Sequence, residues 1–302
     1  MRYPDILDAI AIYRRNGNVA RTLRAKRSRK TNGVPIIEVA YDLQAGTYVE
    51  AALARPQLYR DLAAEAASLL APLLRRNDLI LDIGSGEFTI LSGIANECLS
   101  TDQRVLGCEL SLSRISIGRE YMARALRFDL KDAIFPFVGE FGRLPLADKS
   151  IDIVISSHAI EPNRGSERAI LRELVRVARR ALLLIEPCYE NASEEIRARM
   201  DAHSYARGIG AAIKAAGASL HDPMPMRNSG NPLNPSFAFM ANLDEPTSPR
   251  PDQYWSCPET GLPLEDRGSI FFSPGSLLAY PVIDSTPVLR RDAAILYSAL
   301  AR

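Results

Sequence analysis

The 302-residue chain has 37 Lys and Arg against 36 Asp and Glu, with 47% hydrophobic and 24% charged residues. This composition is typical of a folded globular protein, and the net charge of +1 argues against a broad nucleic-acid or membrane-binding surface. No apolar run reaches the ~18–20 residues that span a bilayer, and the length suits one large domain plus a small one. The four cysteines are far apart and form no CxxC pair, so we expect reduced thiols in a cytoplasmic protein.

The amino-terminal segment predicts a short helix followed by a basic arm. Residues 3–14 have a helical pattern, and the acids in this apolar stretch, with no cleavage-like site, argue against a signal peptide. Residues 14–30 contain eight Lys and Arg and no acid. Such a run could bind phosphates of a nucleic acid, a nucleotide sugar or a lipid headgroup, or it could be a solvated, mobile arm.

Strands and helices are predicted to alternate through the middle of the chain. From Gly46 to Arg76 the pattern is helical, with interruptions near Pro56 and Pro72. The expected strands are 79–83, 104–109, 134–138, 151–156 and 181–186, and the expected helices are 88–97, about 111–126, 166–179 and material up to about 216. This order predicts an α/β fold with a doubly wound, mostly parallel sheet covered on both faces.

The carboxyl-terminal third has a different character. Residues 222–253 carry seven prolines, although 236–243 could form a late strand of the sheet, and 244–252 has the composition of a linker. Short β-like runs from Tyr254 onward predict a small β-rich module. We therefore divide the chain into a helix and basic arm at 1–45, a main domain at 46–245 and a small module at 254–302.

The most informative segment is residues 79–91, LILDIGSGEFTIL. A short apolar run ends in Asp82, and Gly84 and Gly86 follow, as in a buried strand that turns sharply into a helix beneath a nucleotide-like ligand. Glycine allows the tight turn and the close approach of a ligand to the main chain. A phosphate would avoid the carboxylate of Asp82, whereas a ligand with a cationic centre and an amino group would be favoured beside it. S-adenosylmethionine has both.

Polar residues at the ends of the following strands extend this candidate site, because ligands of open parallel sheets bind at the carboxyl ends of the strands. Glu109 could accept both hydroxyls of a ribose, Glu140 could accept an adenine amino group, and Phe141 could cover the ring. The candidate cofactor-binding residues are Asp82, Gly84, Ser85, Gly86, Glu109, Leu110, Glu140, Phe141, Ser156 and Tyr48.

The loop after the fourth strand would face the reactive end of the ligand. His158 is the first candidate general base and Glu161 the second, although both could be ordinary loop or capping residues. Tyr41, Gln44 and Tyr48 could fold over the cofactor as a lid or simply pack. No two histidines lie at metal-ligand spacing, so no metal site is expected.

Residues from about 40 to 245 resemble the class I S-adenosylmethionine-dependent methyltransferases. The matching segments are LDIGSGE, the acid of GCELS, the block VGEFGRLPLADKSIDIVIS and the strand LLLIEP. The resemblance implies a Rossmann-like methyltransferase with S-adenosylmethionine as cofactor. It places Asp82, Gly84 and Gly86 at the methionine part, Glu109 at the ribose, and Glu140 with Phe141 at the adenine. Phe88 stands where the family often has a third glycine.

The tail, over about residues 254–292, resembles the small zinc-ribbon-like activator subunits of tRNA, ribosomal and release-factor methyltransferases and their short bacterial relatives. The likeness lies in CPETGLPLE and YPVIDSTPVL. Only Cys257 remains in this tail, and a structural zinc site needs about four ligands, so we expect no zinc. The module would then be stabilised by its apolar core and by docking against the main domain.

These features predict methyl transfer from S-adenosylmethionine to an acceptor, with a hydroxyl of a small molecule or glycan as our first hypothesis. The activator-like tail leaves an RNA or protein acceptor open, and the basic segment 14–30 leaves nucleic-acid binding open. A nicotinamide-dependent dehydrogenase of the same topology is a further alternative, but it would need a third small residue in the glycine turn. The last alternative is a non-catalytic scaffold protein that binds S-adenosylmethionine.

Overall fold

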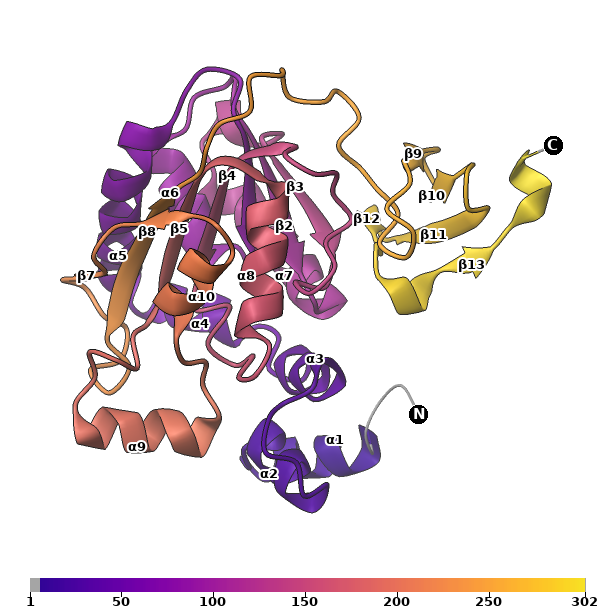
Figure 1. Ribbon diagram of the computed structural model, residues 1–302. Coiled ribbons are helices and arrows are strands. Elements are labelled where there is room, and N and C mark those ends of the chain that lie inside the picture. Colours follow the sequence, from indigo (N-terminus) through magenta and orange to yellow (C-terminus); the bar gives the residue numbers. More distant parts are fainter. Residues whose placement is uncertain (1–5, 302) are drawn as a thin grey trace.

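The computed structural model describes residues 6–301 and is built around an eight-stranded sheet (Figure 1). The strand order is β3-β2-β1-β4-β5-β8-β6, with β7 paired to β8; strands β1 to β5 are parallel, and β8 runs antiparallel to β5. The strands are β1 (Leu79–Ile83), β2 (Arg104–Glu109), β3 (Ile134–Val138), β4 (Ile151–Ser157), β5 (Ala178–Pro187), β6 (Ser219–Leu220), β7 (Met224–Pro225) and β8 (Ser236–Asn242). This confirms the predicted doubly wound, mostly parallel sheet.

Helices cover both faces of the sheet because successive strand side chains point to opposite sides. In β1, Leu81 packs into the core beneath α8 and α10, whereas Ile80 packs into the core beneath α5, α6 and α7. The helices are α4 (Thr47–Ala54), α5 (Pro56–Leu70), α6 (Thr89–Cys98), α7 (Leu112–Ala125), α8 (Glu167–Val177), α9 (Glu194–His203) and α10 (Ile209–Ala215). Single turns of 3-10 helix are η1 (Ala71–Leu73), η2 (Phe128–Leu130), η3 (Arg291–Ala293) and η4 (Ser298–Ala301).

The proline positions were read correctly, whereas one strand was predicted too short. Pro56 is the first residue of α5, and Pro72 lies in the 3-10 turn that ends this helical region. Strand β5 begins at Ala178, three residues before the predicted start. The predicted strand began too late because it excluded Arg179 and Arg180. Charged residues rarely occupy a buried strand unless they are paired, and both of these arginines are buried.

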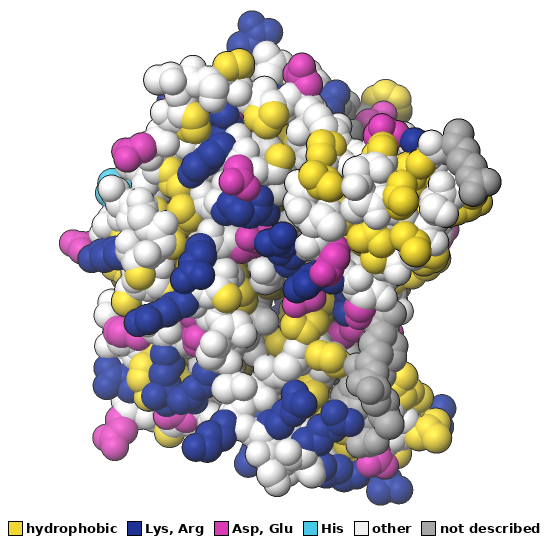
Figure 2. Space-filling view, turned by 45° about the vertical axis from the view of Figure 1, so that its right-hand side comes forward, with side chains coloured by type: hydrophobic (Ala, Val, Ile, Leu, Met, Phe, Trp, Pro, Cys, Tyr) yellow, Lys and Arg dark blue, Asp and Glu magenta, His cyan; other side chains and the backbone are white. Residues whose placement is uncertain are grey.

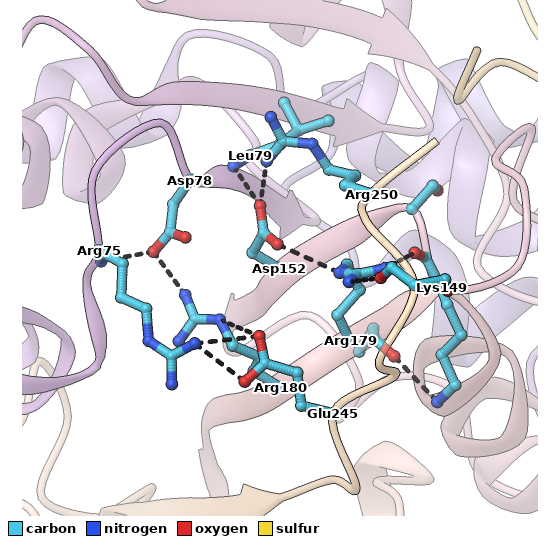
Figure 3. A network of polar contacts seen from close by, with 12 residues as sticks. Arg75, Asp78, Leu79, Lys149, Asp152, Arg179, Arg180, Glu245 and Arg250 are labelled. Carbon is cyan, nitrogen blue, oxygen red and sulfur yellow. Dashed lines mark hydrogen bonds and ion pairs between the residues drawn. The ribbon is translucent and has the colours of Figure 1, made fainter. Parts of the chain in front are cut away.

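Their partners form a polar network at the amino ends of the strands, opposite the ends where a ligand is expected (Figure 3). Asp78 accepts hydrogen bonds from the Arg75 backbone N–H at 2.7 Å and from Arg180 at 2.6 Å. Asp152 accepts from the Leu79 backbone N–H at 2.8 Å, lies 3.5 Å from Arg179 and is also bonded by Arg250. The network thus ties β1, β4 and β5 to the segment that leads to the small module.

Replacing Asp152 by Ala is expected to lower the free energy of unfolding by about 3 kcal/mol, because it leaves buried positive charge without its carboxylate. Urea denaturation measures this as a lower midpoint at an unchanged slope. Asp148→Ala is the matched control, since Asp148 pairs with Arg176 on the surface, where loss costs below about 1 kcal/mol. Equal midpoints for the two variants would contradict the structural role given to Asp152.

The amino-terminal region is a cluster of three helices, α1 (Ile6–Arg14), α2 (Val19–Lys26) and α3 (Val34–Asp42). Residues 14–30 are therefore part of a packed helical cluster and not an arm, although six of their eight Lys and Arg side chains are exposed, as the solvated interpretation predicts. Val19 and Leu23 are fully buried, and the Asn18 side chain caps α2 by accepting the Arg21 N–H at 2.8 Å. The Arg24 guanidinium donates to backbone carbonyls at the end of α9. The start of the predicted helix, residues 3–5, lies outside the described residues.

Positive charge is not gathered into one large patch on the face shown in Figure 2, where Lys and Arg are interspersed with acidic and apolar side chains. Within the amino-terminal cluster, Lys26 pairs with Asp8 at 2.6 Å. Part of the positive charge of the basic segment is therefore paired with an acidic side chain of the same chain. Over residues 6–301, no helix has the length and apolarity needed to cross a membrane.

The carboxyl-terminal residues form a separate five-stranded antiparallel sheet, which confirms the predicted β-rich module. Its strands are β9 (Glu265–Asp266), β10 (Ile270–Ser273), β11 (Leu278–Ile283), β12 (Thr286–Pro287) and β13 (Ile295–Leu296). The module covers the free edge of β3: the Leu289 N–H donates to the Val138 carbonyl at 2.9 Å. Trp255 packs edge-on against Phe137 of β3 and Phe271 of β10, at 5.2 and 5.5 Å between ring centroids.

The surroundings of Cys257 are those of a buried thiol. Its sulfur lies 3.1 Å from the Tyr280 hydroxyl, and all four cysteines are free. Among the described residues, no group of three or more His, Cys, Asp or Glu side chains is placed to hold a metal ion. The likeness of this module to zinc-ribbon activators thus rests on its sequence.

Candidate functional site

A cavity of about 590 Å³ lies at the carboxyl ends of the central strands. The strand order reverses between β1 and β4, and open parallel sheets bind ligands in the crevice at such a point. The predicted residues that line the cavity are Asp82, Gly84, Ser85, Gly86, Glu109, Leu110, Glu140, Phe141, Ser156, Tyr48, His158 and Glu161, which is every one of the candidates. The structure therefore brings together residues from five separate stretches of the chain, at 48, 82–86, 109–110, 140–141 and 156–161.

The glycine turn needs its glycines for two reasons. Gly84 and Gly86 have φ of 66° and 57°, in the left-handed region that favours glycine. A Cβ on Gly84 would also lie 2.4 Å from the Cβ of Ala159. Phe88, at the position where the resembled family often has a third glycine, is fully buried against Gly107 and Gly118. Its ring fills the space between β2 and α7, so the turn closes without the third glycine.

Two carboxylates are held at the tips of β1 and β2. Glu109 accepts the Gly86 N–H at 3.0 Å and the Ser111 N–H at 2.9 Å, which fixes its orientation toward the glycine turn. Burial raises the pKa of Glu109, and the nearby Arg114 opposes that rise. Burial, together with the charge of Glu109, raises the pKa of Asp82 to about 7. A positively charged ligand would lower both pKa values and would be attracted by both groups.

Tyr41 and Tyr48 of the predicted lid segment line the cavity, whereas Gln44 does not. The Arg114 guanidinium lies between the two tyrosine rings, 4.9 Å and 4.6 Å from their centroids. Glu87, directly after the glycine turn, fixes the segment by accepting the backbone N–H groups of Gly46 at 3.0 Å and Val49 at 2.7 Å.

Among the described residues that line this cavity, Arg114 is the arginine buried beside the glycine turn. It is 2% exposed, and its Nη1 lies 3.8 Å from Glu87. Its Nη2 has no hydrogen-bond partner within the described residues. Because a buried, unpartnered donor is costly, this atom indicates that a ligand acceptor group completes the site.

His158 and Glu161 form a hydrogen-bonded pair, which two further residues contact: Asn234, just before β8, and Ser236, the first residue of β8. Glu161 Oε2 lies 2.9 Å from His158 Nδ1, and Asn234 Nδ2 donates to the same oxygen at 3.0 Å. The other ring nitrogen, Nε2, lies 2.7 Å from the Ser236 hydroxyl. Burial acts to lower the pKa of His158, but the charge and hydrogen bond of Glu161 outweigh it, so the pKa is raised.

Glu186, near the end of β5, fixes the loop that contains His158 and Glu161 by hydrogen bonds to its backbone. Its carboxylate accepts the Ser156 hydroxyl at 2.9 Å and the backbone N–H groups of Ala159, Ile160 and Glu161 at 2.9 to 3.2 Å. Burial raises the pKa of Glu186 to about 7, and the positive charge of His158 opposes that rise. Glu186 thus positions both candidate catalytic residues without lining the cavity itself.

Replacing Glu161 by Gln is expected to lower the pKa of His158 below its wild-type value, because the burial remains while the charge is removed. NMR titration of the ring protons measures this, with His221 as the internal control. In the wild type, the pair contributes stability that is present below the ordinary pKa of 6.5 and is lost as pH rises through the raised folded value. An unchanged His158 titration in the variant would contradict the pairing.

The carboxyl-terminal module also reaches this site. Burial raises the pKa of Glu140, and the charge of Arg290 from the module opposes that rise. The Arg290 side chain is 3% exposed and pairs with Glu38 of α3 at 2.7 Å. One side chain of the module therefore contacts the amino-terminal cluster and acts on the loop at the end of β3.

Sequence reasoning missed four residues of this region, namely Arg114, Glu186, Asn234 and Ser236. Glu186 carried a signal, since it ends an apolar strand as Asp82 does. Asn234 and Ser236 lie in a proline-rich stretch and reach His158 only because β8 pairs with β5, with Ser236 opposite Pro187. Arg114 had no local signal, because one arginine in an amphipathic helix usually faces solvent.

Comparisons with known proteins agree with this architecture. Residues 81–185 match a family model described as "Methyltransferase domain". No curated protein matches the sequence significantly.

Among solved structures, the chain is similar to one from a complex of the Haloferax volcanii Trm112 methyltransferase activator with a methyltransferase. The TM-score is 0.51 at 15% identity, over 67% of this chain and 97% of that one. An S-adenosylmethionine-dependent methyltransferase from Aquifex aeolicus gives 0.43 at 17% identity, over 59% and 88%. Magnesium protoporphyrin IX methyltransferase from Synechocystis, with bound S-adenosylhomocysteine, gives 0.48 at 14% identity, over 61% and 83%. The first of these likenesses shows a shared fold.

Proposed function

We propose that this chain, an S-adenosylmethionine-dependent methyltransferase in which residues 81–185 match a methyltransferase domain, methylates a hydroxyl group of a small molecule or glycan. One observation carries the proposal: the His158–Glu161 pair lines the same cavity as the carboxylates Asp82 and Glu109. An oxygen nucleophile must lose a proton on methylation, and a histidine oriented by a carboxylate is suited to accept it.

The residues at the glycine turn fit the cofactor. Glu109 would accept the ribose hydroxyls, and Asp82 would lie beside the positively charged methionine part. The unpartnered Nη2 of Arg114 would donate to the carboxylate of that part. Glu140 and Phe141 would border the adenine. When bound, the cofactor supplies a methyl group already activated by its sulfonium centre.

His158 would act as the general base in this scheme. The acceptor hydroxyl would replace the Ser236 hydroxyl as the donor to Nε2, and the proton would then move to that nitrogen. Glu161 would stabilise the imidazolium through its contact with Nδ1. The chain therefore contributes the approach geometry, the base and the exclusion of water.

The test measures formation of S-adenosylhomocysteine with a panel of hydroxyl-bearing small molecules and glycans. We expect His158→Asn to lower turnover about a hundredfold while calorimetric affinity for S-adenosylmethionine stays unchanged. His221→Asn is the matched control, because this exposed histidine is bonded to Asn242 and does not line the cavity.

Three results would overturn the proposal. Equal turnover in the two histidine variants would remove the assigned base. Binding of NADH instead of S-adenosylmethionine would indicate a dehydrogenase. Binding of S-adenosylmethionine with no product from any acceptor would indicate a non-catalytic scaffold.

A further inference from the structure

The cavity has a second part that the cofactor residues do not account for. Along α5 it is lined by Tyr59, Leu62, Ala66 and Leu70. Their spacing of three, four and four residues places them on one face of the helix. Opposite them, Ile90 and Ile94 of α6 line the same space. This part of the cavity lies between the two helices and the sheet, and we call it the α5 channel.

The α5 channel is apolar and narrows along the helix from Tyr59 to Leu70. Tyr59 and Leu62 are partly exposed, whereas Ala66 and Leu70 are only 1% exposed. The sheet side is formed by Ile155, Leu183 and Ile185, which belong to the same apolar core. The described residues that line the channel between these limits carry no charge.

The channel opens at the catalytic end of the molecule. Tyr59 and Leu62 of α5 line the same cavity as Ser156, which borders the proposed cofactor position, and Asn234 lines it too. Asn234 is buried, and its Oδ1 has no hydrogen-bond partner among the described residues. A donor on a bound molecule would satisfy this oxygen next to His158, while the rest of that molecule extends along α5.

We propose that the α5 channel binds a hydrocarbon chain of the acceptor, so that the substrate is an amphiphile with its hydroxyl-bearing head at His158 and Asn234. This inference rests on the proposed methyl transfer to a hydroxyl and narrows its substrate class. A glycan would require hydrogen-bonding partners along its length, and the channel wall offers apolar side chains instead. A hydrocarbon chain gains free energy from this wall in proportion to the area it buries.

Linear primary alcohols from hexan-1-ol to dodecan-1-ol test the proposal, titrated calorimetrically into the full chain saturated with S-adenosylhomocysteine. Affinity is expected to rise about fourfold with each added methylene until the channel is full, and then to level off. Ala66→Phe places a ring in the channel and is expected to move the plateau to shorter alcohols. Ala64→Phe, on the exposed face of the same helix, is the matched control and should follow the wild type.

Affinity that does not depend on chain length in the wild type would overturn the proposal without any variant. A plateau that Ala66→Phe leaves in place, in a variant that melts cooperatively and binds S-adenosylhomocysteine, would do the same. Ala66→Leu serves where the phenylalanine variant fails to fold. Titration with S-adenosylhomocysteine alone separates the two ideas: if it binds and the alcohols do not, the channel assignment fails while the cofactor assignment stands.

Discussion

Replacing Glu109 by Ala is expected to weaken binding of S-adenosylmethionine about a thousandfold. The proposed contacts are two charge-assisted hydrogen bonds to the ribose, each worth ~1.5–3 kcal/mol, and their joint loss is about 4 kcal/mol. The same carboxylate holds the Gly86 and Ser111 backbone N–H groups, so its removal also loosens the glycine turn. Isothermal titration calorimetry with S-adenosylmethionine and S-adenosylhomocysteine measures the effect.

Glu120→Ala is the matched control, because Glu120 lies exposed on α7 and pairs with the equally exposed Arg124. It should bind like the wild type. Glu109→Gln keeps the shape and one acceptor oxygen, so its affinity should fall between the two. Wild-type affinity in Glu109→Ala would show that the tip of β2 does not hold the ribose.

Replacing Asp82 by Asn is expected to weaken cofactor binding about a hundredfold and at the same time to stabilise the free protein. Unfolded Asp82 would ionise near 3.8, whereas in the folded chain burial and the charge of Glu109 raise its pKa to about 7. At 1.36 kcal/mol per pKa unit, this difference between the two pKa values corresponds to a loss of folding stability of at most about 4 kcal/mol when Asp82 is ionised. A neutral side chain avoids that cost, but it no longer attracts a positively charged ligand.

The sign of the pH dependence follows from proton binding. Between pH 4 and 7 the folded chain holds a proton on Asp82 that the unfolded chain has released, so wild-type stability falls as pH rises through this window. The stability gain of Asp82→Asn should therefore grow over the same window and be largest above pH 7. Wild-type affinity for the cofactor should weaken below pH 7, where protons compete for the carboxylate.

Urea denaturation and calorimetry over pH 4 to 8 measure both trends for Asp82. Asp222→Asn, at an exposed position outside the cavity, should leave both unchanged. A stability gain without any loss of affinity would show that Asp82 is buried for structural reasons alone. A loss of affinity without the pH-dependent gain would show that its carboxylate is already ionised in the free protein.

The features that could be predicted from sequence are those encoded within a few consecutive residues. The apolar run before Asp82, the glycines of the turn and the acid that ends β2 predicted two strands and the turn that follows the first. Because parallel strands place their carboxyl ends at one edge of the sheet, these patterns also predicted that Asp82 and Glu109 would meet. His158 and Glu161 followed from the same rule.

Contacts between distant segments were decided only by the tertiary structure. Nothing near Arg114 marks it as buried between Tyr41 and Tyr48, and nothing before β8 marks Asn234 as a neighbour of Glu161. The packing of the basic segment was missed for the same reason, since Leu23 has its apolar partners in other helices.

The sequence by itself determined the succession of strands, turns and helices, and hence the likeness to a methyltransferase. It could do so because periodicity and turn chemistry depend on residues close together in the chain. Only the tertiary structure decided which charges are buried, which atoms lack a partner, and that an apolar space continues beneath α5. Burial and pairing depend on how whole elements pack against one another. That packing is set by the sum of many weak contacts across the chain.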